Sequence, residues 1–197
     1  SIVPDKKLVL DSNGREHPYD RLLLATGADP SLPPIEGAHL KGIFTLRGIE
    51  DADRIRDFAG NAKRAVVVGG GLLGLESAHS LAKLGLEVCV VEVCSRLLPR
   101  QLDTDGARTL QRLLEEKGLS FALEDRVRAL EGDGSVETVQ LKSGRTMSAE
   151  IVLISAGIRG RSSLARDAGI TVNNGIVVDD NLRTSEPDIF AAGDPIE

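Results

Sequence analysis

The segment that most constrains the fold is a glycine-rich turn after three consecutive valines. Residues 66–68 are all valine, and Gly69, Gly71 and Gly74 follow in the spacing Gly-x-Gly-x-x-Gly. β-Branched residues favour a strand. In this spacing the first glycine allows a sharp turn, the second makes room for a pyrophosphate and the third lets a helix pack closely. The segment therefore predicts a strand, a tight turn and a helix that bind a dinucleotide.

The residues after the turn extend this pattern. Apolar residues recur at helical spacing through residues 72–84, and Gly85 follows where helices often end in glycine. Residues 87–91 then predict a second strand, which ends at Glu92. A carboxylate about twenty residues beyond the glycines can accept hydrogen bonds from an adenosine ribose. The complete order favours a nucleotide site over a glycine turn that only closes a loop.

The following residues complete half of a doubly wound sheet. Asp103 or Thr104 can cap a helix that ends at Gly118. The other expected features are a turn at residues 97–99, inward-facing Leu110, Leu113 and Leu114, a third strand at 119–123, an antiparallel meander at 127–130 and 136–141, and a last strand at 151–157. In such a sheet the ligand lies beyond the carboxyl ends of the strands.

An internal repeat links the start of the chain to its second half. A shift of 130 positions superposes Gly14-Arg15 on Gly144-Arg145, Asp20 on Glu150, residues 22–24 on 152–154, and Gly27 on Gly157. Each copy is a hairpin, for which Asn13-Gly14 is a strong signal, followed by an acid and an apolar strand. The repeat suggests two related dinucleotide-binding units.

The remaining segments predict a connector and two more strands. Prolines make residues 28–43 an extended connector, and residues 176–178 and 189–192 predict strands. The second of these strands stops at Gly193 and Asp194. That carboxylate can bind a polyol, or it can be an ordinary surface aspartate.

Composition excludes several classes of function. The net charge is −6 and only 3% of residues are aromatic, so the cationic footprint of nucleic-acid binding is missing. No apolar run approaches the roughly 20 residues of a membrane span, and no signal peptide opens the chain. We therefore expect a cytoplasmic protein with no nucleic-acid or membrane partner.

The chain has few residues for catalysis by side chains. The two cysteines, Cys89 and Cys94, could form a redox dithiol. However, Cys89 alternates with strand valines, which favours one core thiol and one loop thiol in a reducing compartment. There is no Ser/His/Asp set and no metal-ligand cluster, so we predict no catalytic side chain and no metal site.

Four motifs occur in the order found in flavoproteins with two dinucleotide sites. They are Leu-Ala-Thr-Gly at residues 24–27, Gly-Gly-Gly-Leu-Leu-Gly-Leu-Glu at 69–76, Ser-Ala-Gly at 155–157 and Asp-Ile-Phe-Ala-Ala-Gly-Asp at 188–194. With these motifs nearly the whole chain resembles the FAD- and NAD(P)H-dependent reductases of the pyridine nucleotide disulfide oxidoreductase group. Within the group it is most similar to the large subunit of NADH-dependent nitrite reductase, followed by rubredoxin and ferredoxin reductases.

The resemblance implies two sets of cofactor contacts. FAD would contact Thr26, Gly27, Arg47 and Asp194. NADH would place its pyrophosphate on Gly69, Gly71, Leu72, Leu73 and Gly74, its nicotinamide near Glu76 and Gly157, and its adenosine ribose on Glu92. Glu76 and Arg47 have plain structural alternatives, as a first-turn helix acid and a solvated surface residue. Glu92 favours NADH because it would repel the 2′-phosphate of NADPH, whereas Arg96 and Arg100 could accommodate that phosphate.

The resemblance also implies an α/β fold in which a Rossmann-like domain with a meander carries parts of a second, FAD-binding domain. Residues 1–43 and 158–197 would be the FAD-domain segments, and residues 44–157 the NAD(P)H-binding domain. Members of the group have an FAD glycine fingerprint upstream and an interface domain downstream, so we expect the central part of a longer protein. In that protein NADH would pass hydride to the flavin, and the flavin would pass electrons to an acceptor domain or protein.

Two other functions stay open. The chain alone could be a non-catalytic NAD-holding module that does not retain FAD. An ordinary dehydrogenase is also conceivable, but it leaves Thr26-Gly27 and Gly193-Asp194 unexplained. Strands at 22–25 and 189–192 would expose an apolar edge, so we expect the chain to self-associate. Two positions depart from the group's pattern: Gly160, where proline is common, and Pro195, where a small or apolar residue is usual.

Overall fold

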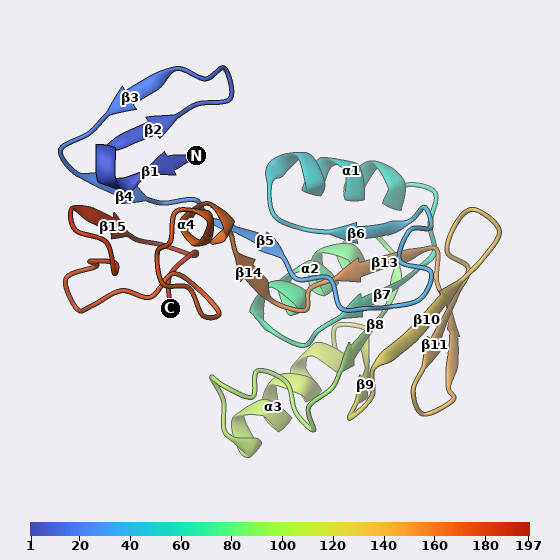
Figure 1. The fold of residues 1–197 in the computed structure, drawn as a ribbon. Coiled ribbons are helices and arrows are strands. Elements are labelled where there is room, and N and C mark those ends of the chain that lie inside the picture. Colours follow the sequence, from blue (N-terminus) through green and yellow to red (C-terminus); the bar gives the residue numbers. More distant parts are fainter. The chain divides into compact units, whose positions relative to one another are not determined.

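The computed structural model describes all 197 residues, which fold into two compact units (Figure 1). The larger unit comprises Pro30–Gly157, and the smaller unit comprises Ser1–Asp29 with Ile158–Glu197. Residues 30–43, which the sequence assigned to the first FAD-domain segment, belong to the larger unit, where Ile35 packs in a core cluster with Val139. The cofactor roles assigned to the segments stay predictions.

The larger unit is built on a five-stranded parallel sheet. The strand order is β6, β13, β7, β8, β9. The strands are β6 (Ile43–Thr45), β13 (Ile151–Ile154), β7 (Arg64–Val68), β8 (Glu87–Glu92) and β9 (Leu119–Leu123). Ile154 pairs with both Thr45 and Val68, so three strands end together at one edge of the sheet. The α/β fold class predicted from the sequence is confirmed.

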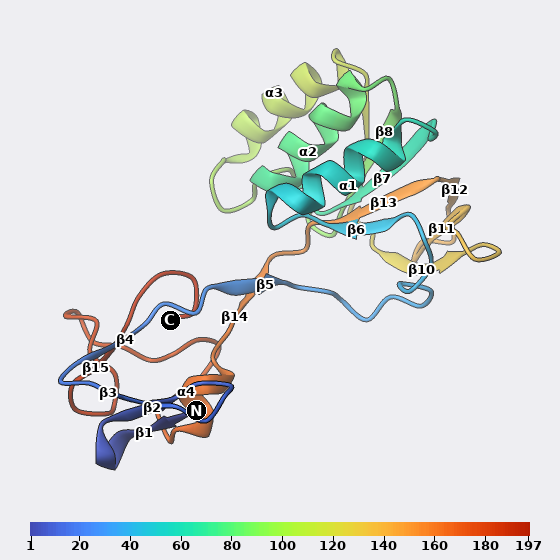
Figure 2. The ribbon, with the colours of Figure 1, turned by 90° about the horizontal axis from the view of Figure 1, so that it is seen from above.

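Layers of different kinds cover the two faces of this sheet (Figure 2). One layer contains helices α1 (Ile49–Ala59), α2 (Leu72–Lys83) and α3 (Thr104–Glu115), and the other contains strands β10 (Val127–Glu131), β11 (Thr138–Leu141) and β12 (Thr146–Ser148). Side chains alternate along a strand. Val67 therefore packs with Leu75 of α2, whereas Val66 packs with Val139 of the antiparallel meander. Burial on both faces explains the unbroken valine run.

Helix α3 begins where the sequence predicts. The Asp103 side chain accepts a hydrogen bond from the Gly106 N–H at 2.8 Å, which makes Asp103 the N-cap. One detail of the prediction is wrong, because Leu113 is 43% exposed. Leu110 and Leu114 pack against the core, and Leu113 lies one helical step away from that stripe.

Glu150 fixes the start of β7. Its carboxylate accepts hydrogen bonds from the backbone N–H groups of Lys63 at 3.2 Å and Arg64 at 2.8 Å. It also pairs with the Arg64 guanidinium at 2.6 Å. The hydrogen bond from the Arg64 side chain, opposed by partial burial, holds the pKa of Glu150 below its ordinary value of 4.5.

This shift predicts an acid-dependent contribution to stability. The folded-state pKa lies below the unfolded value, so the stabilisation is present above pH 4.5 and is lost as the pH falls through the folded pKa. We expect Glu150→Gln to be less stable than wild type at neutral pH and to lose less stability on acidification. Urea unfolding over a pH series measures both effects. Glu116→Gln, on the exposed end of α3, serves as the control. Parallel pH profiles for wild type and Glu150→Gln would contradict the assignment.

The smaller unit has its own core, which contains Ile170, Ile176 and Ile189. Its elements are β1 (Ile2–Val3), a 3₁₀ helix (Pro4–Lys6), β2 (Leu8–Leu10), β3 (Glu16–Pro18), β4 (Leu22–Leu24), β5 (Ala28–Pro30), β14 (Ile158–Gly160), α4 (Ser163–Asp167) and β15 (Ile189–Ala191). The predicted hairpin forms between β2 and β3, and β4 pairs in parallel with β15. The strand predicted at residues 176–178 does not form, because Ile176 makes only isolated bridges, to Val172 and Ile196.

The internal repeat recurs in the strand register. In the β2–β3 hairpin Leu8 pairs with Pro18, and in the β11–β12 hairpin Thr138 pairs with Ser148. Each of these residues lies 130 positions from its counterpart. Strands β4 and β13 follow the two hairpins. The repeat is therefore present in the strand pairing as well as in the amino-acid sequence.

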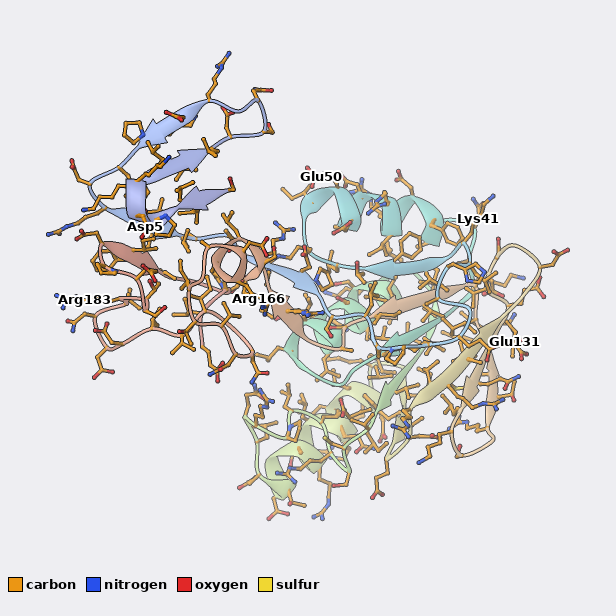
Figure 3. The ribbon with its side chains drawn as sticks, viewed as in Figure 1. Asp5, Lys41, Glu50, Glu131, Arg166 and Arg183 are labelled. Atoms are coloured by element: carbon orange, nitrogen blue, oxygen red, sulfur yellow. The ribbon has the colours of Figure 1, made fainter.

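Charged side chains lie on the outer surface of the larger unit. Figure 3 shows Glu50 at the start of α1, and Lys41 and Glu131 beside the β10–β11 hairpin. None of the helices combines the length and the apolar content that a membrane-spanning segment requires. No group of three or more histidine, cysteine and acidic side chains is arranged to hold a metal ion.

Candidate functional site

Gly69 begins the turn at the carboxyl end of β7. Its φ angle is +114°, and a Cβ atom at this position would lie 2.2 Å from the carbonyl oxygen of Ser155. Its N–H donates a hydrogen bond to the carbonyl oxygen of Val91 at 2.8 Å. Only glycine can therefore occupy position 69 while β7 keeps its spacing from β13 and β8.

The other two glycines of the motif have different surroundings. A Cβ atom at Gly74 would lie 2.1 Å from the carbonyl oxygen of Gly69, so this glycine lets α2 rest on the turn. A Cβ atom at Gly71 would meet nothing within 4 Å. Gly71 also has φ −80° and ψ 178°, which any residue can adopt. The protein's own packing thus requires Gly69 and Gly74, but it leaves the space at Gly71 empty.

The turn places the amino end of α2 beside the empty space at Gly71. The first hydrogen bond of the helix runs from the Leu75 N–H to the Gly71 carbonyl oxygen at 2.9 Å. The N–H groups of Leu72, Leu73 and Gly74 therefore have no partner one turn earlier, and Gly71 has no side chain to cap them. Free N–H groups at the positive end of the helix dipole attract an anion such as a diphosphate.

Glu92 lies at the end of β8 and is only 8% exposed. Its Oε2 accepts the Gly70 N–H at 2.6 Å, and its Oε1 accepts the Cys94 N–H at 2.8 Å. A carboxylate offers about four acceptor positions. The Cys94 thiol uses a third, so one remains for a ribose hydroxyl. Glu92, the acid predicted to bind the adenosine ribose, therefore also links the glycine turn to the residues that follow β8.

We expect Glu92→Gln to destabilise the larger unit. A glutamine amide keeps one acceptor oxygen but turns an NH₂ group toward the Gly70 or Cys94 N–H, so one buried N–H loses its partner. The expected loss is about 1–3 kcal/mol in the free energy of unfolding. Urea denaturation measures it, with Glu87→Gln at the exposed start of β8 as the matched control. Equal losses in the two variants would show that the Glu92 hydrogen bonds contribute nothing.

The two cysteines are free thiols. The Glu92 carboxylate, as hydrogen-bond acceptor, together with burial raises the pKa of the Cys94 thiol above its ordinary 9.0. A thiol with a raised pKa is a poor nucleophile. Cys89 lies in β8 and packs against the core cluster of the meander. This arrangement agrees with the preferred prediction of one core thiol and one loop thiol.

The turn opens onto a cleft of about 850 Å³ within the larger unit. It runs past Ser155 beyond β13, Gly69 and Gly71 beyond β7, and Glu92 on β8, and residues 33–35 form part of its far wall. The chain leaves β7 toward β8 and returns to β13 on the other side of β7, so this is a topological switch point of the sheet. Cofactor sites have volumes of roughly 300–1,000 Å³.

Other residues predicted to contact NADH lie around this cleft rather than in it. Leu72 and Leu73 are exposed at the start of α2. Glu76 lines a separate groove between α1 and α2, together with Leu46 and Ser80. The Gly157 carbonyl oxygen accepts a hydrogen bond from the Ser31 N–H at 2.9 Å. These residues are close to the turn in sequence, but they are not part of the cleft lining.

The residues predicted to contact FAD fall in both units. In the smaller unit Thr26 Oγ1 donates to the Arg161 carbonyl oxygen at 2.6 Å, and the Arg161 N–H donates to the Gly27 carbonyl oxygen at 2.9 Å. Asp194 is exposed just beyond β15. Arg47 belongs to the larger unit, where its N–H donates to Asp51 at 2.9 Å before α1 begins.

The two departures from the group's pattern meet in the structure. A Cβ atom at Gly160 would lie 3.0 Å from Cα of Pro195 and 3.1 Å from the carbonyl oxygen of Asp194. A side chain at position 160 would press on the segment that carries Asp194. Glycine at 160 therefore lets the backbone of Asp194 and Pro195 pass close by.

Sequence reasoning missed most of the far wall of the cleft. The lining includes Pro34, Arg126, Arg128 and Lys142, which come from the connector and from the meander. Arg126 and Arg128 alternate along the chain and Lys142 follows the apolar end of β11. That pattern predicts an outward-facing strand surface, but it does not indicate that the surface borders the glycine turn.

Comparison with known proteins supports this architecture. A nitrite reductase [NAD(P)H] of Bacillus subtilis (strain 168) is 41% identical over 196 residues, which cover 100% of this chain and 24% of that protein. A rubredoxin-NAD(+) reductase of Pseudomonas putida is 35% identical and covers 98% of this chain and 51% of that protein. The structure of a NAD-dependent persulfide reductase from A. fulgidus superposes with a TM-score of 0.94 at 36% identity. This superposition covers 100% of this chain and 37% of that protein.

The chain thus spans between about a quarter and half of the length of these proteins. The family described as pyridine nucleotide-disulphide oxidoreductase matches residues 1–196. The turn, the switch-point cleft and this match lead to one conclusion. The chain belongs to the pyridine nucleotide-disulphide oxidoreductase family, whose members are NAD(P)H-dependent flavoprotein oxidoreductases.

Proposed function

We propose that the chain is the NAD(P)H-binding part of an FAD-dependent oxidoreductase that passes electrons from NADH through flavin to an acceptor. The large subunit of nitrite reductase is the assignment we favour. The observation that carries the proposal is the empty space at Gly71, which lies in one cleft with Glu92. The protein's own packing does not require glycine at that position, whereas a bound diphosphate does.

Different residues of the cleft would bind different parts of NADH. The free N–H groups at the start of α2 would bind the diphosphate, and Glu92 would accept a hydrogen bond from the adenosine ribose. Strand β13 flanks β7 on the side opposite to β8. The nicotinamide would therefore extend away from Glu92, toward Ser155 and Ala156, which line that end of the cleft. The protein's contribution is thus to fix the position and orientation of the dinucleotide.

The smaller unit has groups that fit a flavin nucleotide. Gly193 has φ +83°, and the only atom within 4 Å of a Cβ there would be Pro195 Cδ at 3.8 Å, so the backbone before Asp194 can be approached closely. The exposed Asp194 carboxylate would bind ribityl hydroxyls. Thr26 and Gly27 would face the flavin from the turn after β4. When bound, FAD would supply the chemistry of accepting hydride from NADH and releasing electrons singly.

A second acceptor class has its own support. The identities to the rubredoxin-NAD(+) reductase and nitrite reductase relatives, 35% and 41%, are close. The alternative function is therefore an NAD(P)H-dependent rubredoxin or ferredoxin reductase, which uses the same cleft and differs in what reoxidises the flavin.

Anaerobic reduction tests the proposal. The flavoprotein that carries this chain is mixed with one equivalent of NADH, and the absorbance of oxidised flavin is followed. We expect the absorbance to fall, and then to return on addition of nitrite for the favoured assignment or of oxidised rubredoxin for the alternative. Flavin that stays oxidised in the presence of NADH would contradict both.

A further inference from the structure

The loop between β8 and α3 lies against the glycine turn. Residues 93–102 form neither helix nor strand. Leu97 and Leu98 are nevertheless buried, in the core cluster that also contains Leu75 of α2. Other residues of the loop line the cleft, namely Val93, Pro99, Arg100 and Gln101. The loop is therefore a packed part of the wall beside the turn.

Leu98 has an unfavourable backbone conformation. Its φ angle is +48°, in the left-handed region that a bulky residue rarely adopts. It also precedes Pro99, and the residue before a proline normally takes an extended conformation. Such strain persists only where the surrounding structure holds it. The Leu98 N–H donates to the Gly70 carbonyl oxygen at 3.2 Å, and the Leu98 carbonyl oxygen accepts the Leu102 N–H at 2.9 Å.

Arg96 closes the loop around Leu98. Its Nη2 donates to the carbonyl oxygen of Pro99 at 3.2 Å, and its Nε donates to that of Leu102 at 3.4 Å. Neither oxygen accepts a hydrogen bond from a backbone N–H. Arg96, which the sequence suggested as a partner for the 2′-phosphate of NADPH, does not line the cleft. The guanidinium thus binds the protein's own backbone on the far side of Leu98.

Leu98 in turn fixes one peptide group of the glycine turn. The Gly70 N–H donates to Glu92 at 2.6 Å, and the Gly70 carbonyl oxygen accepts the Leu98 N–H. The chain has no cis peptide bond, and in a trans peptide the carbonyl group and the following N–H point in opposite directions. The Gly71 N–H therefore points away from Leu98, and no group of the chain accepts it. It adds a donor to the free N–H groups at the start of α2.

We infer that Arg96 is a positioning residue for the dinucleotide: by holding Leu98 in its left-handed conformation, it fixes the peptide group between Gly70 and Gly71 and keeps the Gly71 N–H available to the diphosphate. The inference rests on the proposed function, since it requires a diphosphate over the turn. A guanidinium suits the role because its rigid fork of donors can serve two carbonyl oxygens at once.

Binding of NADH, ADP and adenosine to the 197-residue chain tests the inference. Arg96→Ala is expected to lose about tenfold in affinity for NADH and ADP, and less than threefold for adenosine, which has no diphosphate to meet the Gly71 N–H. Titration calorimetry measures the three affinities. Arg108→Ala is the matched control, because Arg108 pairs with Asp105 on the exposed surface of α3. It should change none of the affinities.

Hydrogen exchange of the Leu98 amide measures the loop without any ligand. This amide should exchange at least about tenfold faster in Arg96→Ala than in wild type or Arg108→Ala, because its bond to the Gly70 carbonyl oxygen is no longer maintained. A loss of NADH affinity with unchanged Leu98 exchange would mean that Arg96 acts through its charge alone. That result would overturn the inference, as would equal losses for ADP and adenosine.

Arg96→Lys gives the same test in a variant that keeps the charge. An ammonium group lacks the planar fork, so we expect an intermediate result, with about threefold weaker ADP binding and faster Leu98 exchange than in wild type. Wild-type behaviour in both measurements would contradict the inference and leave the proposed function intact. Absence of NADH binding to wild type would instead refute the proposed function, and the inference with it.

Discussion

Replacing Gly71 by valine is expected to remove NADH binding while the protein stays folded. A side chain at this position meets no protein atom within 4 Å, and the backbone angles there suit any residue. The same side chain would fill the space over the amino end of α2, where the diphosphate must lie. We expect a loss in NADH affinity of at least about 100-fold, equivalent to about 2.7 kcal/mol. Calorimetric titration with NADH measures it.

Gly60→Val is the matched control for this variant. Gly60 also belongs to the larger unit, has φ −58°, and would place its Cβ no closer than 3.5 Å to the nearest atom, the Asp57 carbonyl oxygen. It does not line the cleft. The control should bind NADH as wild type does, and both variants should unfold within about 1 kcal/mol of wild type. Wild-type NADH affinity in Gly71→Val would mean that the diphosphate lies elsewhere.

Replacing Gly74 by alanine is expected to have the opposite profile, with a large loss of stability. The new Cβ would lie 2.1 Å from the Gly69 carbonyl oxygen and 3.2 Å from its carbon. Backbone atoms cannot swing aside as a side chain can, so α2 must move away from β7. Overpacking of this kind costs about 3 kcal/mol. For a chain of this size the melting temperature should fall by about 6–12 °C.

Gly106→Ala separates this effect from the general effect of alanine in a helix. Gly106 lies in the first turn of α3, and a Cβ atom there would lie 3.1 Å from Oδ1 of the N-cap Asp103, a side-chain atom and not backbone. Alanine has the higher helix propensity, by about 1 kcal/mol, so this variant should be as stable as wild type or more stable. Thermal unfolding followed by circular dichroism compares the two. A Gly74→Ala melting point equal to that of Gly106→Ala would contradict the close packing of α2 on the turn.

The part of the fold that could be predicted is the part determined by local sequence. The valine run, the glycine spacing and the helical periodicity of residues 72–84 each act over a few neighbours. Strand β7, helix α2 and strand β8 accordingly form where they were predicted. The hairpin repeat was predictable for the same reason, since a turn and its flanking strands specify their own register.

Helix α1 was missed because its sequence signal is weak. Most of residues 49–59 are polar or charged, and only Ile55 and Ala59 are buried. The residue before the helix is Gly48, which offers no capping side chain. The available signal was Asp51, whose carboxylate accepts the Arg47 and Gly48 N–H groups at 2.9 and 3.2 Å. An acid three residues after a glycine cap is the reciprocal half of a capping box.

The strand predicted at residues 176–178 failed for a tertiary reason. The Ile176 N–H donates to the Pro195 carbonyl oxygen at 2.7 Å, and the Val177 N–H donates to the Thr171 carbonyl oxygen at 3.1 Å. These partners belong to different segments, so the residues bond irregularly instead of joining one sheet. β-Branched composition favours a strand only where a neighbouring strand is available.

The candidate site was predictable on its near side only. Gly69, Gly71 and Glu92 are ordered by one strand–turn–helix–strand segment, which carries its own geometry. The opposite wall consists of residues 33–35 and 126–128 and of Lys142, which long-range packing brings to the turn. No local pattern specifies such an arrangement. The charged side chains of this wall, Arg126, Arg128 and Lys142, therefore emerged only from the structure.

The central claim is that a nicotinamide dinucleotide lies across the turn formed by residues 69–74. Amide chemical-shift mapping of the ¹⁵N-labelled chain during an NADH titration tests it most directly, because it reports position as well as affinity. We predict saturable shifts concentrated on the N–H groups of Gly70–Gly74, of Glu92–Cys94 and of Ser155. Shifts confined to residues outside the cleft, or none at millimolar NADH, would contradict the claim.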